Sequence, residues 1–228
     1  MAERARPRLI VVDDDAGLRT AIEQMGTSAG LEVQAFGSAE EFLTAIPKHD
    51  GPCCLILDQR MSGLSGLGLQ QQLLRSGVHL PIIFLTGFAD VRSAVQAMRA
   101  GAFDVLEKPF HPGMLLDRIK AALDLDADAL IAVSENAEIA TRLATLSPKE
   151  RHVCDLLVQG KTSKEIARDL KIGLPTVAKH RAKVLRKCHV QNVIGLVSLI
   201  ERCRRVNELR ASGPAPWVPK TPSSPDTR

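Results

Sequence analysis

Four apolar runs decide the fold of this 228-residue chain: LIVV (9–12), CCLIL (53–57), PIIFL (81–85) and FDVLE (103–107). Near-continuous apolar runs of this length, with amphipathic segments between them, are typical of parallel strands that are buried on both faces. The carboxyl ends of such strands lie at one edge of the sheet, where open α/β sheets bind their ligands. The sequence therefore predicts a polar site at this edge from the residues that follow the runs: Asp13, Asp14, Asp15, Asp58, Thr86 and Lys108.

Strand and helix patterns alternate five times over the first 124 residues. Strands are expected at 9–12, 32–36, 53–57, 81–85 and 103–107, and helices at about 16–29, after Ser38, from the SGLSG turn to Arg75, at 91–100 and at about 112–125. This alternation predicts an α/β domain with a doubly wound, five-stranded parallel sheet of the flavodoxin-like order.

The carboxylates at the predicted edge favour a hard cation. Asp13 and Asp14 are adjacent and repel each other unless a cation lies beside them, and Asp58 adds oxygens from another strand. Mg²⁺ is bound in proteins through one or two such carboxylates together with water. Thr86 and Lys108 would add a hydroxyl group and a positive charge. The combination suits a phosphoryl group carried by Asp58.

From residue 146 the patterns are wholly helical. SPKE (147–150) and TSKE (162–165) are capping boxes, and a short turn at Gly173 precedes a longer basic helix at about 175–187. A last helix is expected at about 192–209. Residues 125–145 are acidic and alanine-rich, which predicts a helical linker, and the Pro/Ser-rich residues 211–228 predict a disordered tail. The expected domains are therefore 1–124, the linker 125–145, and an all-α helix-turn-helix domain at 146–210.

Charge divides the chain in the same way. Residues 1–124 hold 12 Lys and Arg against 15 Asp and Glu, whereas residues 146–210 hold 15 against 6. The basic region suits a polyanion such as DNA. No apolar run approaches the roughly 20 residues of a membrane span, and no apolar segment follows the basic N-terminus. A cytoplasmic protein without a membrane partner is expected.

Residues 9–124 resemble the receiver domain of two-component response regulators in the motifs VVDDD, LDQRMSGLSG, FLTGFADV and GAFDVLEKPF. The resemblance implies that Asp58 is the phosphoacceptor and that Asp13 and Asp14 hold Mg²⁺ with the Arg60 backbone carbonyl. It also implies that Thr86 is the switch hydroxyl, that Lys108 pairs with the phosphate, and that the bond from Lys108 to Pro109 is cis.

The sequence departs from the receiver pattern at two places. Ser62 stands where the family usually has proline, from which we expect a more mobile loop. Val105 stands where the family has the aromatic residue that reports phosphorylation. Phe103 lies two residues earlier and is expected on the same face of the strand, so it is either a substitute for that aromatic residue or part of the core.

Residues 146–200 resemble LuxR-type helix-turn-helix domains in LSPKE, GKTSKEIARDL and TVAKHRAKVLRK. Val177, Val184 and Leu185 are expected to form the apolar stripe of the basic helix. The resemblance implies that one set of residues faces base edges and another reaches the DNA backbone: Ala178, Lys179 and Ala182, and Thr176, Lys183 and Arg186. Together the two halves resemble FixJ/NarL-type transcriptional regulators.

The resemblance implies a regulator that a histidine kinase phosphorylates at Asp58 and that then dimerises on double-stranded promoter DNA, with RNA polymerase as a further candidate partner. It is not expected to be an enzyme. Two alternatives stay open. One is a DNA-binding regulator that works without phosphorylation, and the other is an aspartate-nucleophile phosphatase with Asp13 as nucleophile and Asp15 as general acid.

Overall fold

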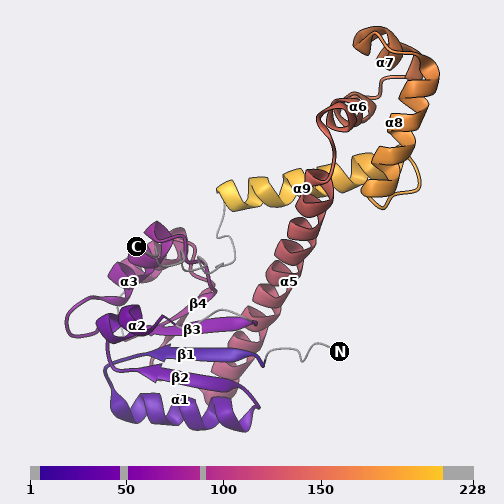
Figure 1. The fold of residues 1–228 in the computed structure, drawn as a ribbon. Helices are drawn as coiled ribbons and strands as arrows, with labels where there is room; N and C mark the ends of the chain where they lie inside the picture. Colours follow the sequence, from indigo (N-terminus) through magenta and orange to yellow (C-terminus); the bar gives the residue numbers. More distant parts are fainter. Residues whose placement is uncertain (1–5, 47–50, 88–90, 213–228) are drawn as a thin grey trace, which may run out of the picture. The chain divides into compact units, whose positions relative to one another are not determined.

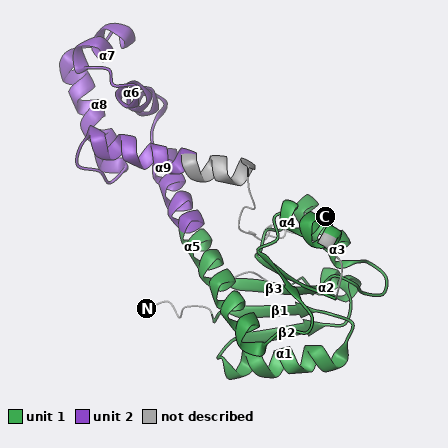
Figure 2. Cartoon of the chain, turned by 180° about the vertical axis from the view of Figure 1, so that it is seen from behind, with its two compact units in different colours: residues 1–131, 212–228 green, residues 132–211 purple. Residues whose placement is uncertain are grey.

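The structure, a computed structural model, describes residues 6–46, 51–87 and 91–212 (Figure 1). The chain divides into two compact units (Figure 2). The first extends to Ile131, and the second comprises Ala132–Ala211. In the described part of the chain, no helix is both long enough and apolar enough to cross a membrane.

The first unit is built on a five-stranded sheet with the order β2-β1-β3-β4-β5, in which all neighbouring strands are parallel. Its strands are β1 (Arg8–Val12), β2 (Glu32–Phe36), β3 (Cys53–Asp58), β4 (Ile82–Thr86) and β5 (Asp104–Glu107). The predicted flavodoxin-like fold is thus confirmed. The register pairs Val12 with Leu57 and Asp58 with Leu85, so the polar strand ends lie in one row.

Helices cover both faces of this sheet, and two apolar cores result. On one face, α1 (Ala16–Ser28) and α5 (Pro112–Ala144) pack over the sheet, with Leu115 and Ile119 fully buried. On the other lie α2 (Ala39–Ala45), α3 (Gly66–Arg75) and α4 (Val91–Arg99), with Phe42 and Leu69 fully buried. Burial on both faces explains why the three central strands, β1, β3 and β4, read as apolar runs.

Helix α5 is longer than the sequence pattern suggested. We expected it to end near residue 125, ahead of a separate helical linker, but it continues without a break to Ala144. Neither Gly nor Pro interrupts the chain from 114 to 144. Asp126 is also 2% exposed, and its carboxylate accepts a hydrogen bond from the Cys53 N–H (2.8 Å), which fixes the start of β3. This buried contact holds the turn at which the helix was expected to end.

The second unit contains α6 (Pro148–Val158), α7 (Ser163–Leu170), α8 (Leu174–Lys187) and α9 (Val193–Ser212). Both predicted capping boxes are present, at Ser147 and Thr162. Val177 and Val184 of α8 are fully buried, and Leu185 packs against the same core. The helix-turn-helix order and the apolar stripe are therefore confirmed. Of the predicted tail, residues 213–228 lie outside the described residues.

Phe42→Ala tests how far the first unit depends on its core. Phe42 is fully buried, and its ring lies 5.4 Å from that of Phe36. Truncation leaves a cavity, and we expect a loss of about 3 to 5 kcal/mol of unfolding free energy. Native-state exchange of the Leu55 and Ile56 amides reports this value for the first unit alone. The control, Met98→Ala, alters a side chain that is 47% exposed and should cost no more than about 0.5 kcal/mol.

Candidate functional site

Three carboxylates meet at the carboxyl edge of the sheet. Asp13 and Asp14 follow β1, and Asp58 ends β3. One oxygen from each lies within 4.8 Å of the others. Asp13 is fully buried and Asp58 is 6% exposed, whereas Asp14 is exposed, so the cluster is open to solvent on one side. Hard oxygen ligands with an open side, where water can complete the shell, fit Mg²⁺.

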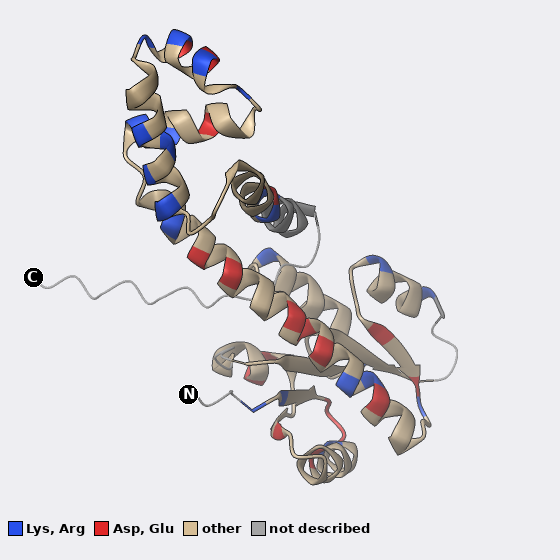
Figure 3. Cartoon of the chain, turned by 90° about the vertical axis from the view of Figure 1, so that its right-hand side faces the viewer, with Lys and Arg blue, Asp and Glu red and all other residues tan. Residues whose placement is uncertain are grey.

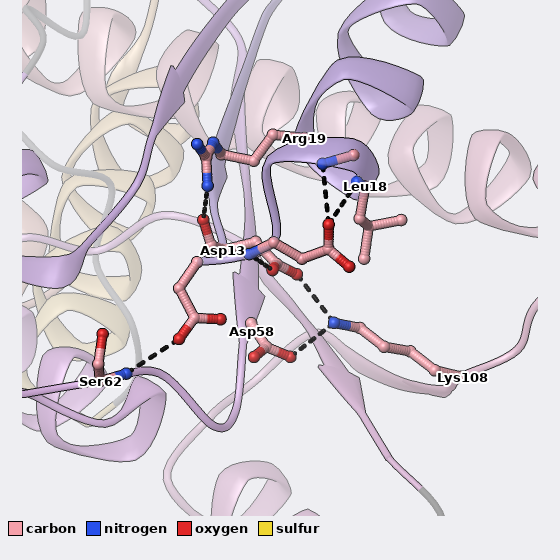
Figure 4. Close-up of polar contacts among 9 residues, drawn as sticks. Asp13, Leu18, Arg19, Asp58, Ser62 and Lys108 are labelled. Carbon is pink, nitrogen blue, oxygen red and sulfur yellow. Dashed lines mark hydrogen bonds and ion pairs between the residues drawn. The ribbon is translucent and has the colours of Figure 1, made fainter.

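Lys108 bridges the two buried carboxylates (Figure 4). Its ammonium lies 2.9 Å from Asp13 Oδ2 and 2.8 Å from Asp58 Oδ1. Burial, reinforced by the charge of Asp13, raises the pKa of Asp58 above its ordinary value, although Lys108 opposes this. Partial burial acts to lower the pKa of Lys108, but its bonds to the two carboxylates outweigh that effect and raise it. The predicted cis bond between Lys108 and Pro109 is present.

Asp13 is held in place by its neighbours. Its Oδ1 accepts a hydrogen bond from the Asp15 N–H (2.8 Å), and Arg19 donates to its backbone carbonyl (2.6 Å). The carboxylate of Asp15 caps α1, because it accepts from the N–H groups of Gly17 and Leu18. These two bonds lower the pKa of Asp15, which disfavours its use as the general acid of a phosphatase. This cap was not predicted from the sequence, although an aspartate just before a helix is its usual signal.

The loop between β3 and α3, residues 59–65, follows Asp58 directly and contacts the cluster at Asp14. The Ser62 N–H donates to Asp14 Oδ2 (3.1 Å), a bond that proline could not make. The departure at position 62 therefore adds a link to the acidic cluster. Arg60 lies in the same loop, two residues after Asp58. A second contact that was not predicted from the sequence is made by Glu40, whose Oε1 accepts from the Leu64 N–H at 2.9 Å.

The three predicted switch residues do not form one group. Thr86 ends β4 at the same edge of the sheet as Asp58, is 7% exposed, and donates to the Gly87 carbonyl (3.3 Å). Val105 packs against the core under α2, α3 and α4, but Phe103 packs against the core under α1 and α5. The prediction that Phe103 and Val105 share a face is therefore wrong. Strand β5 begins at Asp104, so the alternation of side chains does not extend back to Phe103.

Helix α8 presents most of the predicted DNA-contacting residues to solvent. Lys179, Ala182 and Arg186 are exposed and lie three or four residues apart, which places them along one face of the helix. Thr176 and Ala178 are also exposed, and Lys183 is half-buried. Lys and Arg residues recur along this helix (Figure 3). Val177 and Val184 occupy the opposite, buried side.

Lys187, the last residue of α8, is bound within the second unit. Its ammonium donates to Glu150 Oε2 (2.6 Å) and to the Thr145 carbonyl (2.8 Å). The Glu150 side chain is only 5% exposed, and the same oxygen accepts from the Ser147 N–H (2.9 Å). This contact joins the end of α8 to the start of α6 and holds the charge of Lys187 within the second unit. No signal in the sequence links residues 37 positions apart.

Known proteins match both units. The profile described as response regulator receiver domain matches residues 9–120, and the profile described as bacterial regulatory proteins, luxR family, matches residues 144–200. Nodulation protein W of Bradyrhizobium diazoefficiens is 39% identical over 193 residues, which are 85% of each chain. The chain belongs to the FixJ/NarL-type response regulators.

Two further relatives support this membership of the response regulators. The transcriptional regulatory protein FixJ of Bradyrhizobium diazoefficiens is 36% identical over 88% of this chain and 97% of its own. The solved structure of the response regulator StyR matches with a TM-score of 0.78 and 37% identity, and covers 87% of this chain and all of the StyR chain. This response regulator thus combines a receiver domain with a LuxR-type DNA-binding domain and regulates transcription.

The contact between Glu150 and Lys187 predicts an acid-sensitive second unit in this response regulator. The bond to Lys187, helped by the Ser147 N–H, lowers the pKa of Glu150 to about 2. A carboxyl group whose pKa falls on folding adds stability above its unfolded pKa, about 4.3. That stability is lost as the pH drops toward 2. Urea unfolding at a series of pH values between 6 and 2.5, monitored by amide exchange in α8, should show this decline in the unfolding free energy of the second unit.

A matched variant separates this contact from general acid denaturation. Glu150→Gln keeps the size of the side chain but cannot titrate, so its second unit should be less stable at pH 6 and should lose less between pH 5 and 2.5. Parallel pH profiles for both proteins would contradict the role given to Glu150.

Proposed function

We propose that Asp58 is the residue phosphorylated in this response regulator, with Mg²⁺ held by Asp13, Asp14, Asp58 and the Arg60 backbone carbonyl. The observation that carries the proposal is the Lys108 ammonium, shared at hydrogen-bond distance between Asp13 and Asp58. A cation already placed at the Asp58 carboxylate can neutralise the phosphoryl oxygens that Asp58 would acquire.

The phosphodonor is a phosphohistidine of the partner kinase. An Asp58 oxygen attacks phosphorus, the P–N bond breaks, and the imidazole leaves with its electron pair and takes up a proton. Bound Mg²⁺ supplies charge neutralisation for the transferring group. Lys108 stays at the acyl phosphate and exchanges one carboxylate partner for a phosphoryl oxygen. Thr86, whose hydroxyl donates to the Gly87 carbonyl, turns toward another phosphoryl oxygen.

The output domain binds double-stranded promoter DNA through α8. Ala178, Lys179 and Ala182 read base edges in the major groove, and Thr176, Lys183 and Arg186 reach the DNA backbone. Phosphorylation favours a homodimer that binds two half-sites and acts, in the cytoplasm, on transcription by RNA polymerase. The domain limits are 1–124 for the receiver, 125–145 for the linker and 146–210 for the DNA-binding domain.

One observation favours a second candidate, a regulator that binds DNA without phosphorylation. Phe103 lies on the opposite face of the sheet from Val105, so it does not replace the usual aromatic switch at that position. Titration with a small phosphodonor, followed by size-exclusion chromatography and DNA binding, separates the two candidates. A phosphorylation-dependent dimer supports the first candidate. Equal DNA affinity at every phosphodonor concentration supports the second.

Asp58→Asn should abolish acyl-phosphate formation, because the amide cannot act as the nucleophile. The measurement is intact mass and peptide mapping after treatment with acetyl phosphate and Mg²⁺. The control is Asp124→Asn, which alters an exposed carboxylate of α5 and should label like the wild type. Labelling that persists in Asp58→Asn would refute the assignment, and a label at Asp13 would point to the phosphatase alternative.

Lys179→Ala and Lys183→Ala should affect DNA binding differently. Loss of a base-reading side chain changes sequence preference by about 1 to 3 kcal/mol at the contacted base pair. Loss of a phosphate contact weakens binding to all sequences alike and lowers the salt dependence of log K by about one unit. Binding to a set of single-base promoter variants at several salt concentrations measures both effects. If the two variants showed identical sequence preference and salt dependence, the assignment of Lys179 to base reading and Lys183 to phosphate contact would be wrong.

A further inference from the structure

The loop between β3 and α3 positions the groups around Asp58. The Gly66 N–H, where α3 begins, donates to the Gln59 carbonyl (3.2 Å). A Cβ atom on Gly66 would lie 2.3 Å from the Asp58 carbonyl, so the helix starts directly against the end of the strand. Arg60, the proposed carbonyl ligand, lies inside this loop. A displacement of the loop therefore moves a proposed metal ligand relative to Asp58.

Glu40 lies against this loop from outside the acidic cluster. Its Oε1 accepts from the Leu64 N–H at 2.9 Å, and the same oxygen would be 2.8 Å from a Cβ atom on Gly63. Gly63 has φ +84°, a conformation that favours glycine. The Glu40 carboxylate therefore rests on the backbone of two successive loop residues. The Leu64 N–H also lowers the pKa of Glu40, so the bond is charge-assisted at neutral pH.

Helix α2, which carries Glu40, is anchored in the apolar core. Ala39 and Phe42, on either side of Glu40, are fully buried. The Ser38 hydroxyl caps the helix by accepting from the Glu41 N–H (3.1 Å). The Glu41 side chain accepts from the Gly37 N–H (2.7 Å), before the helix, rather than from the loop. Glu40 thus connects a helix anchored in the core to the loop beside Asp58.

We propose that Glu40 is a positioning residue of the phosphoacceptor site, which fixes the 59–65 loop through Leu64 and thereby sets the affinity of the acidic cluster for Mg²⁺. The inference rests on the proposed function, because it concerns the same site. Asp14 holds the loop two residues earlier, through Ser62, but Asp14 is itself a proposed metal ligand. Glu40 supports the loop from a position that is not part of the metal shell.

The test uses the full chain in four forms: the wild type, Glu40→Ala, Glu40→Gln and Glu41→Ala. Glu40→Gln keeps a side-chain oxygen that can accept from Leu64. Glu41→Ala removes the same charge from the same turn of α2, together with its bond to the Gly37 N–H, but leaves the bond between Glu40 and Leu64 in place. Calorimetric titration gives the Kd for Mg²⁺. Amide exchange of the metal-free protein reports on Leu64 and, for global stability, on Leu55 and Ile56 of β3.

Loss of one hydrogen bond that holds a ligand in place should raise the Mg²⁺ Kd of Glu40→Ala about 5-fold and speed Leu64 exchange by a similar factor. Exchange of the β3 amides should stay unchanged. Glu40→Gln should recover most of the Mg²⁺ affinity, and Glu41→Ala should bind like the wild type.

Three results would overturn the inference: wild-type Mg²⁺ affinity in Glu40→Ala, equal weakening in Glu41→Ala, or faster exchange of the β3 amides in Glu40→Ala. The last result would show a loss of overall stability instead of a local effect. Labelling of the wild type by acetyl phosphate separates this inference from the function on which it rests. If Asp58 of the wild type takes up no phosphate, the proposed function fails; if it does and Glu40→Ala binds Mg²⁺ normally, only the inference fails.

Discussion

The contact of Lys108 with Asp13 and Asp58 is the interaction on which the arrangement of the site depends. It joins residues that follow β1 and β5 to the last residue of β3, which are far apart in sequence. Two buried carboxylates side by side are unfavourable unless a cation compensates them. Lys108 supplies that charge, and Asp14, on the exposed side of the cluster, adds a third carboxylate for a metal ion.

This contact requires a particular sheet. Asp13 and Asp58 are neighbours only because β1 and β3 pair in parallel and in register, with Val12 opposite Leu57. Lys108 reaches both because its N–H is tied to the Thr86 carbonyl at the end of β4 (2.7 Å). A slip of one residue would turn each side chain to the other face of its strand. The two buried cores on either side of the sheet exclude that slip.

The three central strands, β1, β3 and β4, could be predicted from sequence because burial on both faces leaves a short, nearly continuous apolar run. The same runs also predict which residues lie at the carboxyl edge of the sheet, because these residues directly follow the strands: Asp13, Asp14, Asp58, Thr86 and Lys108. The loop contacts could not be predicted in this way. The bonds that Ser62 and Leu64 make depend on the backbone path through Gly63, and Glu40 reads in sequence only as an acidic residue in the first turn of a helix. The prediction that Phe103 and Val105 share a face was wrong because β5 begins at Asp104, one residue after Phe103.

The proposed phosphorylation site keeps the charged groups of the family pattern but has valine at position 105, in place of the aromatic switch residue. Under the proposed function, charge added at Asp58 would act first on Lys108, which contacts it, and then on Asp14, which lies in the same cluster and accepts from the Ser62 N–H. The next groups along the usual route are Thr86 and the residue at position 105. Valine at 105 packs against the core under α4 but offers no ring whose rotation could fill or vacate space beside Thr86. Under the proposed function, a change at Thr86 would therefore reach the α4 and β5 surface by a shift of the backbone or of aliphatic packing instead of by an aromatic flip.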